Sequence, residues 1–393
     1  MNQDALRWLQ EQQLAMVEAT RALSAINSHT ANPEGVSLVQ DDYARMFEGL
    51  GLTRERVTGS EHYGAHQVLR SSGVGAPVLL VGHADTVFPK GTFESVQLAG
   101  DRLEGPGVLD MKGGLVVVAY AVRALAQSVG LAALPPLHIV VVADEEVGSP
   151  EGTDVLKRAA RLGDVQASAA LVFESGRAND AIVTCRKGVG LVRVSARGKA
   201  AHAGNAHAEG INAVWALAQF ADGAQRLTDY AHGITVNVGT FKGGTSQNTV
   251  AENAVAELDL RFEAVVDADA LMQRLEALAR RAEASVPGVH IEIEGGVVRY
   301  PMERLDASGA LYARYAEAAV ASGLAAPESP LVGGGSDANT TAALGIASID
   351  ALGPRGTGFH TREEYIDITT MVPKAQALAR LLLGMQAVGT RPA

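Results

Sequence analysis

The first part of the chain alternates short apolar runs with longer segments of helical spacing. Strand-like runs occupy residues 76–87, 137–148 and 167–176, and a helical apolar pattern covers 113–130. Strands that alternate with helices are typical of a mostly parallel sheet covered on both faces. Such sheets carry their chemistry just beyond the carboxyl ends of their strands. The pattern therefore predicts an α/β domain with a site at that edge.

The pattern of apolar and polar positions changes at about residue 188. Residues 188–300 read as strand, helix, strand, strand, helix and strand, which is the order of a ferredoxin-like α+β domain. The earlier pattern resumes after about residue 301, and a chain of 393 residues suggests two domains. We therefore expect a discontinuous catalytic domain of residues 1–187 and 301–393, with a smaller domain of residues 188–300 inserted into it.

Charge and composition exclude several classes of function. The formal net charge is −11 and Lys and Arg are not clustered, which argues against nucleic acid as a partner. No run approaches the roughly 20 apolar residues needed to cross a bilayer, so we expect no membrane partner. The first 23 residues read as an amphipathic helix rather than a signal peptide, and the single cysteine, Cys185, allows no internal disulfide. We expect a cytoplasmic protein, although a disulfide-free exported protein would look the same.

Acidic and histidine side chains gather in five glycine-rich or strand-end segments. These are GHADTVFPKG, GPGVLDMKGG, ADEEVGS, VFESG and GFHTREEYIDI. They supply the candidate ligands His83, Asp110, Glu146, Glu174 and His360. Two divalent ions that share a bridging carboxylate need about five protein ligands, and two imidazoles with three carboxylates meet that need. Zinc is the first choice for such a set without cysteine, with manganese and cobalt as alternatives.

Each candidate also has an ordinary structural interpretation. Taken alone, His83 could be a core histidine, Asp110 a helix N-cap, and the pair Glu145 and Glu146 part of a solvated loop. Yet Asp85 lies two residues after His83 on the same side of an extended chain, where it could accept the second imidazole N–H. Five such coincidences in one chain favour the metal site.

The ordered motifs resemble a known family. The series H-x-D, G-x-x-D-x-K-G-G, D-E-E-x-G, a strand-end Glu, A-H-A-G, G-G-G-S-D and a late F-H is similar to the zinc peptidase family of aminoacylases, deacylases and glutamate carboxypeptidases. The resemblance covers nearly the whole chain. It is strongest to the bacterial glutamate carboxypeptidases, through INSHTANPEGV and GFHTREEYIDI.

This resemblance implies roles for the candidate ligands. Asp110 would bridge two metal ions, and the peptide that follows it would be cis. His83 and Glu174 would complete one metal site, and Glu146 and His360 would complete the other.

The resemblance also implies roles outside the ligand set. Glu145 would be the general base. The inserted domain would serve for dimerisation or as a lid, and His202 would reach the active site of the partner subunit in a homodimer to stabilise an oxyanion. On the residues alone, His202 is equally well a histidine of a surface loop.

Substrate contacts are expected in the second half of the chain. Asn248 and Arg261 resemble the family's carboxylate-binding groups, although Arg261 could instead be a cross-strand salt-bridge partner. Gly334, Gly335 and Ser336 form a donor-rich loop that could contact the substrate, or simply a tight turn before a helix.

The expected reaction is metal-dependent hydrolysis of an amide bond next to a free carboxylate, in a small peptide or an N-acyl amino acid. The first hypothesis is a glutamate carboxypeptidase-like exopeptidase, and the second is an N-acyl-amino-acid deacylase. A third is an inactive metal-binding protein. The motifs do not separate the first two, because both activities use the same metal centre.

Overall fold

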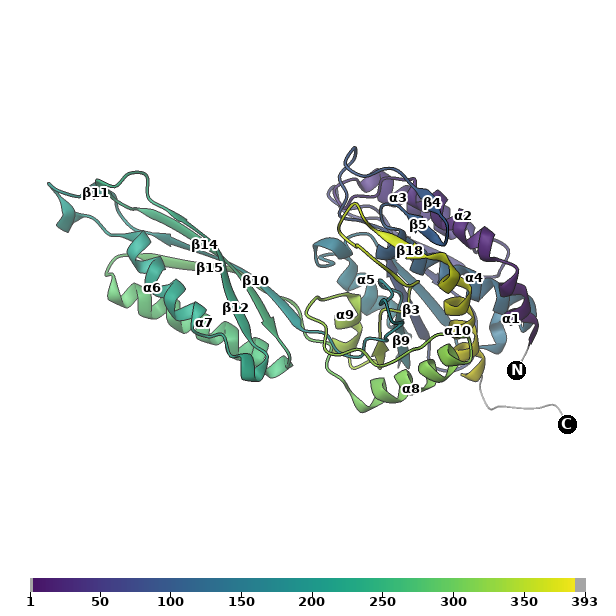
Figure 1. Ribbon diagram of the computed structural model, residues 1–393. Coiled ribbons are helices and arrows are strands. Elements are labelled where there is room, and N and C mark those ends of the chain that lie inside the picture. Colours follow the sequence, from purple (N-terminus) through teal and green to yellow (C-terminus); the bar gives the residue numbers. More distant parts are fainter. Residues whose placement is uncertain (1–2, 386–393) are drawn as a thin grey trace. The chain divides into compact units, whose positions relative to one another are not determined.

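The computed structural model describes residues 3–385, which form two compact units (Figure 1). The large unit contains the chain up to Thr184, residues 304–331, and the chain from Ser336 onward. The small unit contains residues 185–303 together with the short segment 332–335. The small unit is therefore built from two separate stretches of chain.

A mixed six-stranded sheet forms the centre of the large unit. Its order is β1 (Thr53–Val57), β2 (His66–Arg70), β6 (Leu137–Val142), β3 (Val78–His83), β9 (Ala169–Val172) and β16 (Ser348–Ile349). The strands from β6 to β16 run parallel, whereas β1 and β2 are antiparallel at one edge. Every residue of β3 and β6 is buried, as expected for apolar strands covered on both faces. The predicted mostly parallel α/β fold is confirmed.

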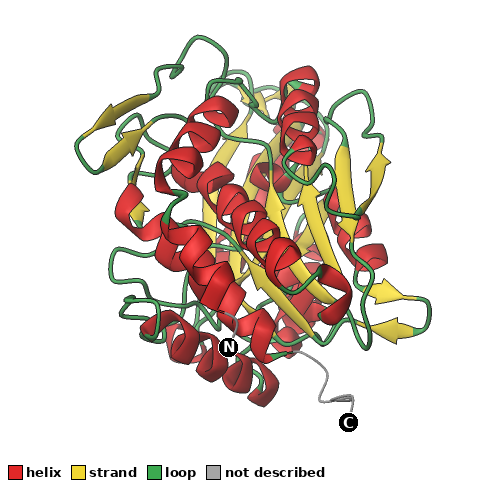
Figure 2. Ribbon diagram, turned by 90° about the vertical axis from the view of Figure 1, so that its right-hand side faces the viewer, coloured by secondary structure: helices red, strands yellow, loops and turns green. Residues whose placement is uncertain are grey.

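Helices cover both faces of this sheet (Figure 2). The apolar α4 (Gly113–Ser128) packs on β3 and contacts α1 (Gln3–Gln10), α2 (Gln13–Ser24) and α10 (Met371–Gly384), and α10 also contacts α8 (Asp306–Val320). Elsewhere α5 (Gly152–Ala159) packs on β6 and α9 (Asp337–Ala343) on β9, while α3 (Pro33–Arg45) contacts β2. A small antiparallel sheet, β17 (Gly356–Thr357), β18 (Tyr365–Asp367), β5 (Arg102–Glu104) and β4 (Gln97–Ala99), joins distant parts of the chain.

The amphipathic N-terminal segment differs from the prediction. The single helix expected over the first 23 residues is wrong, because the described part of this segment forms α1 and α2 with a break between Gln10 and Gln13. A continuous helix would place Gln12 and Gln13 within the buried stripe that includes Leu9 and Met16. Ending α1 at Gln10 keeps these amides out of the core.

The small unit has the order of a ferredoxin-like domain. Its elements are β10 (Gly188–Arg197), α6 (Ala213–Gln225), β12 (Thr235–Gly243), β14 (Asn253–Phe262), α7 (Val265–Ser285) and β15 (His290–Arg299). The antiparallel sheet has the order β12-β14-β10-β15, and burial alternates along β10 and β14 because α6 and α7 pack on one face. Two short strands, β11 (Ala201–His202) and β13 (Thr249–Val250), pair beyond this sheet. The predicted order of elements is confirmed.

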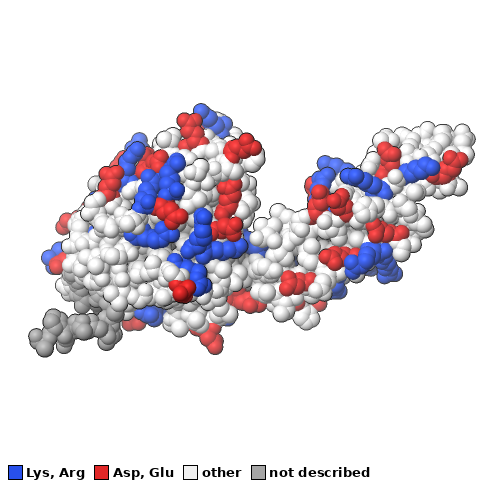
Figure 3. Space-filling view, turned by 180° about the vertical axis from the view of Figure 1, so that it is seen from behind, with Lys and Arg blue, Asp and Glu red and all other residues white. Residues whose placement is uncertain are grey.

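Charged side chains of both signs are distributed over both units. On the face shown in Figure 3, Lys and Arg lie beside Asp and Glu in both units. Among residues 3–385, no helix combines the length and the apolar character that a membrane span requires.

Candidate metal centre

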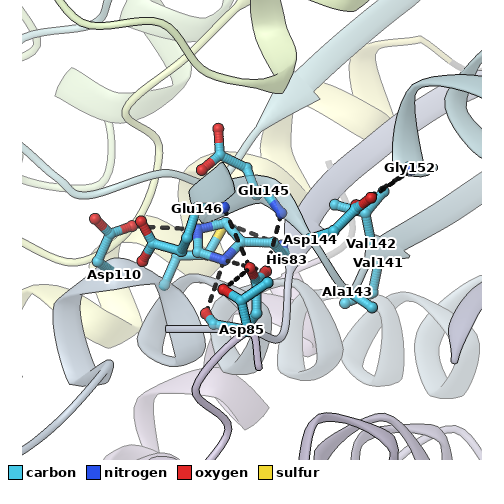
Figure 4. A network of polar contacts seen from close by, with 12 residues as sticks. His83, Asp85, Asp110, Val141, Val142, Ala143, Asp144, Glu145, Glu146 and Gly152 are labelled. Atoms are coloured by element: carbon cyan, nitrogen blue, oxygen red, sulfur yellow. Dashed lines mark hydrogen bonds and ion pairs between the residues drawn. The ribbon is translucent and has the colours of Figure 1, made fainter. Parts of the chain in front are cut away.

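The candidate ligands of the large unit follow the carboxyl ends of its parallel strands. His83 ends β3, Glu146 comes shortly after β6, and Glu174 shortly after β9. Asp110 precedes α4, and its peptide bond to Met111 is cis, as expected. His360 lies in the loop between β17 and β18. Figure 4 shows His83 and Asp110 facing one another, with Glu146 beside them.

Asp110 lies between the two candidate histidines. Its Oδ1 is 3.2 Å from Nε2 of His83, and its Oδ2 is 3.4 Å from Nε2 of His360. Glu174 Oε1 lies 3.6 Å from Nε2 of His83, and Glu146 Oε2 lies 3.1 Å from Nε2 of His360. All five expected ligands therefore lie together, and each oxygen of one carboxylate is beside a different imidazole.

The electrostatic environment of this cluster favours the binding of cations. Burial, together with repulsion from Asp110, raises the pKa of Glu146 to about 7, and burial also raises the pKa of Glu174 to about 7. Oε1 of Glu146 is buried without a hydrogen-bond partner. Crowding buried carboxylates in this way is costly unless positive charge lies between them.

The donor atoms also have the spacing of metal ligands. His83, Asp110 and Glu146 each offer one ligand atom within 4.8 Å of the others, and so do His83, Glu145 and Glu174. Imidazole nitrogen with carboxylate oxygen is a donor set that suits divalent transition metals. The residues present thus fit divalent metal ions.

Comparison with known families matches residues 79–384 to the family described as Peptidase family M20/M25/M40. The chain belongs to this family. It is therefore a metallo-hydrolase that acts on amide bonds, and the resemblance expected from its motifs is confirmed.

Known proteins similar to this M20 peptidase include both enzymes and solved structures. Carboxypeptidase G2 of Pseudomonas sp. strain RS-16 is 28% identical over 391 residues, which span 96% of this chain and 91% of the relative. A tripeptidase from Staphylococcus aureus has a TM-score of 0.78 at 19% identity, with 95% of this chain and 98% of that chain covered. A metallo-carboxypeptidase from Sulfolobus solfataricus has a TM-score of 0.73 at 18% identity and the same coverage. The two solved structures support the fold.

Asp85 holds two parts of the peptidase's metal centre in place. Nδ1 of His83 is 3.0 Å from the Asp85 carbonyl oxygen and 3.3 Å from Oδ1, which orients Nε2 toward Asp110. The same buried carboxylate accepts the backbone N–H groups of Glu145 and Glu146 at 3.1 and 3.2 Å. It also accepts the hydroxyl of Thr30 at 2.7 Å. Asp85 thus orients the imidazole and fixes the Glu145–Glu146 loop.

The two residues before Glu146 have different surroundings. The carboxylate of Asp144 points away from His83, toward α5, where it accepts the N–H groups of Glu151 and Gly152 (Figure 4). The carboxylate of Glu145 instead lies near His83 and Glu174, on the side of the candidate metal ligands.

Glu364 is a buried residue of this site that is not among those predicted from the sequence. Its carboxylate accepts the backbone N–H groups of Gly107, Leu109 and Asp110 at 3.2, 2.8 and 3.0 Å. These bonds hold the loop that presents Asp110. The only sequence signal was its place in the run REEY, just after His360.

Asn248, His202 and Arg261 lie in the small unit. The imidazole of His202 is exposed at the end of β11 and accepts the N–H groups of Gly204 and Asn205. Asn248 is exposed and accepts the Ser246 hydroxyl. The side chains of His202 and Asn248 therefore lie on the surface of this unit, whereas Arg261 lies on β14.

Three arginines of the small unit surround its glycine loop. Arg261 donates to the Gly333 carbonyl at 3.4 Å, and Nη1 of the buried Arg186 donates to the Gly334 carbonyl at 2.9 Å. The buried Arg299 packs so close to Gly335 that a Cβ there would lie 3.1 Å from its Cδ. Arg186 is an addition to the residues expected from the sequence.

Two of the expected substrate-binding side chains are engaged with protein groups. Arg261 binds Asp259, its neighbour two residues earlier on β14, through two hydrogen bonds of 2.8 Å. Ser336 is buried at the start of α9, where its hydroxyl accepts the Ala338 N–H and donates to Asp350. The Ser336 N–H is bound to Asn339. The loop therefore ends in a capped helix.

Proposed function

We propose that this M20 peptidase removes a C-terminal amino acid from a small peptide, as a glutamate carboxypeptidase-like exopeptidase with two zinc ions. The observation that supports this most strongly is the position of Asp110, with one oxygen beside His83 and the other beside His360. A carboxylate in that position can bridge two metal ions. The similarity to carboxypeptidase G2 over 96% of the chain supports the substrate class.

In this proposal, the five ligands divide between two ions as the family resemblance implies. His83 and Glu174 would hold one ion, Glu146 and His360 would hold the other, and Asp110 would contribute to both. Bound ions of this kind make water a nucleophile at neutral pH and polarise the carbonyl of the substrate. Glu145 takes the proton from the attacking water and passes it to the departing amine.

The carboxylate of the substrate would be held by the small unit. Arg261 and Asn248 are the proposed contacts, together with the loop that contains Gly334 and Gly335. Arg186 and Arg299 add positive charge around this loop, and arginine binds carboxylates through paired hydrogen bonds. Ser336 contributes by shaping the loop, because its hydroxyl and N–H already have partners.

His202 would complete the site of the partner subunit in a homodimer. Its exposure at the end of β11 is compatible with reaching another chain. There it would stabilise negative charge on the carbonyl oxygen.

A substrate panel combined with metal analysis tests the proposal. Purified protein is assayed with peptides that end in Glu, peptides that end in other amino acids, and N-acetyl amino acids, before and after chelation. We expect bound zinc, loss of hydrolysis on chelation, recovery on zinc addition, and a preference for Glu-terminated peptides. A preference for N-acetyl amino acids would support a deacylase instead, and hydrolysis that survives removal of all metal would contradict both.

A further inference from the structure

One short hairpin of the large unit, formed by β17 and β18, carries two residues of the metal centre (β18 is labelled in Figure 1). His360 is a candidate metal ligand in the loop between the two strands. Glu364, in the same loop, holds the loop that presents Asp110 through three backbone N–H groups. The position of this hairpin therefore affects two parts of the metal centre.

The side chain of Arg355, directly before β17, binds at the base of this hairpin. Its Nη1 donates to Oδ2 of Asp367, the last residue of β18, at 3.4 Å. The same guanidinium makes two hydrogen bonds with Asp180, from Nε to Oδ1 at 3.2 Å and from Nη2 to Oδ2 at 2.6 Å. Asp180 belongs to the segment that follows Glu174. Because paired hydrogen bonds fix orientation as well as distance, Arg355 sets the base of the hairpin against that segment.

Asp180 is closely constrained by its surroundings. Its side chain is 1% exposed, and its φ of +57° lies in the left-handed region that L residues rarely adopt. A buried carboxylate is costly unless positive charge lies beside it. Besides Arg355, the buried Lys374 of α10 attracts this carboxylate, but α10 carries no candidate ligand. Lys374 can therefore offset part of the charge of Asp180, but it does not hold the hairpin.

Backbone contacts attach the hairpin to the large unit independently of this ion pair. The Asp367 N–H donates to the Arg355 carbonyl at 2.7 Å, and β18 pairs with β5. The Gly176 N–H donates to the Pro354 carbonyl at 3.1 Å. His360, by contrast, has a side chain that is 49% exposed and a φ of +63°, which an L residue keeps only where its surroundings enforce it. Its position therefore depends on the direction in which the hairpin leaves its base.

We propose that Arg355 and Asp180 are positioning residues of the metal centre, and that their ion pair sets the hairpin where His360 can hold one of the two zinc ions. The inference rests on the proposed function, because it takes the two-zinc centre as given. Without the ion pair, the ion at His360 should bind more weakly. The ion at His83 and Glu174 should bind as before, because these ligands follow strands of the central sheet.

Zinc binding by four proteins tests this assignment: the unaltered protein, Arg355→Gln, Asp180→Asn and the double variant. Each metal-free protein is titrated with zinc against a competing chelator, which gives one dissociation constant for each ion. We expect each single variant to bind one ion normally and the other about tenfold more weakly, as when a contact that supports a metal ligand is lost. Because the two residues act as a pair, the double variant should lose no more than either single variant.

Arg54→Gln is the matched control, because the guanidinium of Arg54 also joins three elements of the large unit. It lies on β1 and donates to Asp41 of α3 at 2.6 Å and to Gln67 of β2 at 2.9 Å, and none of these elements carries a candidate ligand. This variant should change neither zinc constant. The thermal midpoint of each metal-free protein separates a loss of stability from a loss of zinc affinity.

The possible results separate this inference from the proposed function. Zinc constants that stay unchanged in both Arg355→Gln and Asp180→Asn would overturn the positioning role and leave the proposed function intact, even if the thermal midpoints fall. Equal weakening of both ions, losses that add in the double variant, or an equal loss in Arg54→Gln would overturn it as well. An unaltered protein that binds fewer than two zinc ions would overturn both the two-zinc centre and this inference.

Discussion

Neighbouring carboxylates of the metal centre have pKa shifts of opposite sign. Burial alone would raise the pKa of Asp110, but hydrogen bonds from His360 and His83 outweigh it and hold this pKa well below its ordinary value. Glu146 and Glu174 are raised to about 7 by burial. The carboxylate between the two imidazoles therefore stays ionised, whereas Glu146 and Glu174 need added positive charge beside them to be fully ionised at neutral pH.

The proposed base can be tested by a change that keeps its shape. Glu145→Gln removes proton transfer while leaving the side-chain volume unchanged. Turnover of the best substrate should fall by about a hundredfold or more, because general-base catalysis contributes on the order of 10²–10⁴. Zinc content, measured on the same preparation, should equal that of the unaltered protein. Near-normal turnover would assign the base elsewhere.

The candidate metal ligands could be predicted from the sequence, whereas some residues that hold them in position could not. His83, Glu146 and Glu174 each follow an apolar strand, so the strand pattern alone places them at one edge of the sheet. Glu364 could not be found in this way, because its bonds to the Asp110 loop join residues 254 positions apart. The pairing of Thr30 with Asp85 was hidden for the same reason, being a contact across 55 positions.

At the scale of elements, the segment before α3 is part of the metal centre. Thr30 lies in it, and its buried hydroxyl bonds to Asp85, which in turn holds His83 and the Glu145–Glu146 loop. Asn32 caps α3 by accepting the Gly35 N–H, which fixes where this segment ends. An N-terminal element of the chain thus positions residues that follow β3 and β6.

Replacing Thr30 tests this link. Thr30→Val keeps the side-chain shape but leaves Asp85 without one donor, and a hydrogen bond to a charged group is worth about 1.5–3 kcal/mol. We expect zinc affinity, measured by competition with a chelator, to fall by about tenfold. Thr30→Ser, which retains the hydroxyl, should restore it. Equal zinc affinity in the valine and serine variants would show that the hydrogen bond does not support the site.

A second element, α10, buries a lysine whose pKa is lowered. Lys374 is fully buried, and burial lowers its pKa from 10.5 to about 8 although Asp180 partly opposes this. A lysine with a lowered folded-state pKa binds fewer protons in the folded state than in the unfolded state between pH 8 and 10.5. Its destabilising effect is therefore complete below about pH 8 and is lost as the pH rises toward 10.5.

The Lys374→Met variant should show this pH dependence. We expect its free energy of unfolding to exceed that of the unaltered protein by about 3 kcal/mol near pH 7, with the difference shrinking as the pH approaches 10.5. Urea unfolding of both proteins at several pH values between 7 and 10.5 measures it. A difference that does not change with pH would mean that Lys374 keeps an ordinary pKa.

The chain folds into two units that differ in their pattern of buried positions. The large unit follows the parallel α/β pattern, and the small unit follows the alternating antiparallel pattern, so both could be predicted from hydrophobic spacing. The assignment of residues 332–335 to the small unit could not, because a short glycine-rich loop has no periodicity. Its contacts with Arg186, Arg261 and Arg299 show where it belongs.

Mixing two inactive variants tests whether subunits share their active sites. Glu145→Gln lacks the base, and His202→Ala lacks the proposed oxyanion donor, so each alone should be nearly inactive. After unfolding and refolding together, mixed dimers would contain one site with both residues intact, and about a quarter of the activity should return. Absence of recovery, with mixed dimers verified by two different tags, would show that His202 acts within its own chain or not at all.

The loop of residues 332–335 also limits how this molecule can be divided. Cutting out residues 185–303 as a free-standing domain would leave behind the Gly333 and Gly334 carbonyls that Arg261 and Arg186 bind, and the backbone against which Arg299 packs. In the excised piece, the guanidinium of Arg186 would lose the Gly334 carbonyl, and the side chain of Arg299 would lose the backbone that covers it. A free-standing version of this domain would therefore need residues 332–335 joined to residues 185–303.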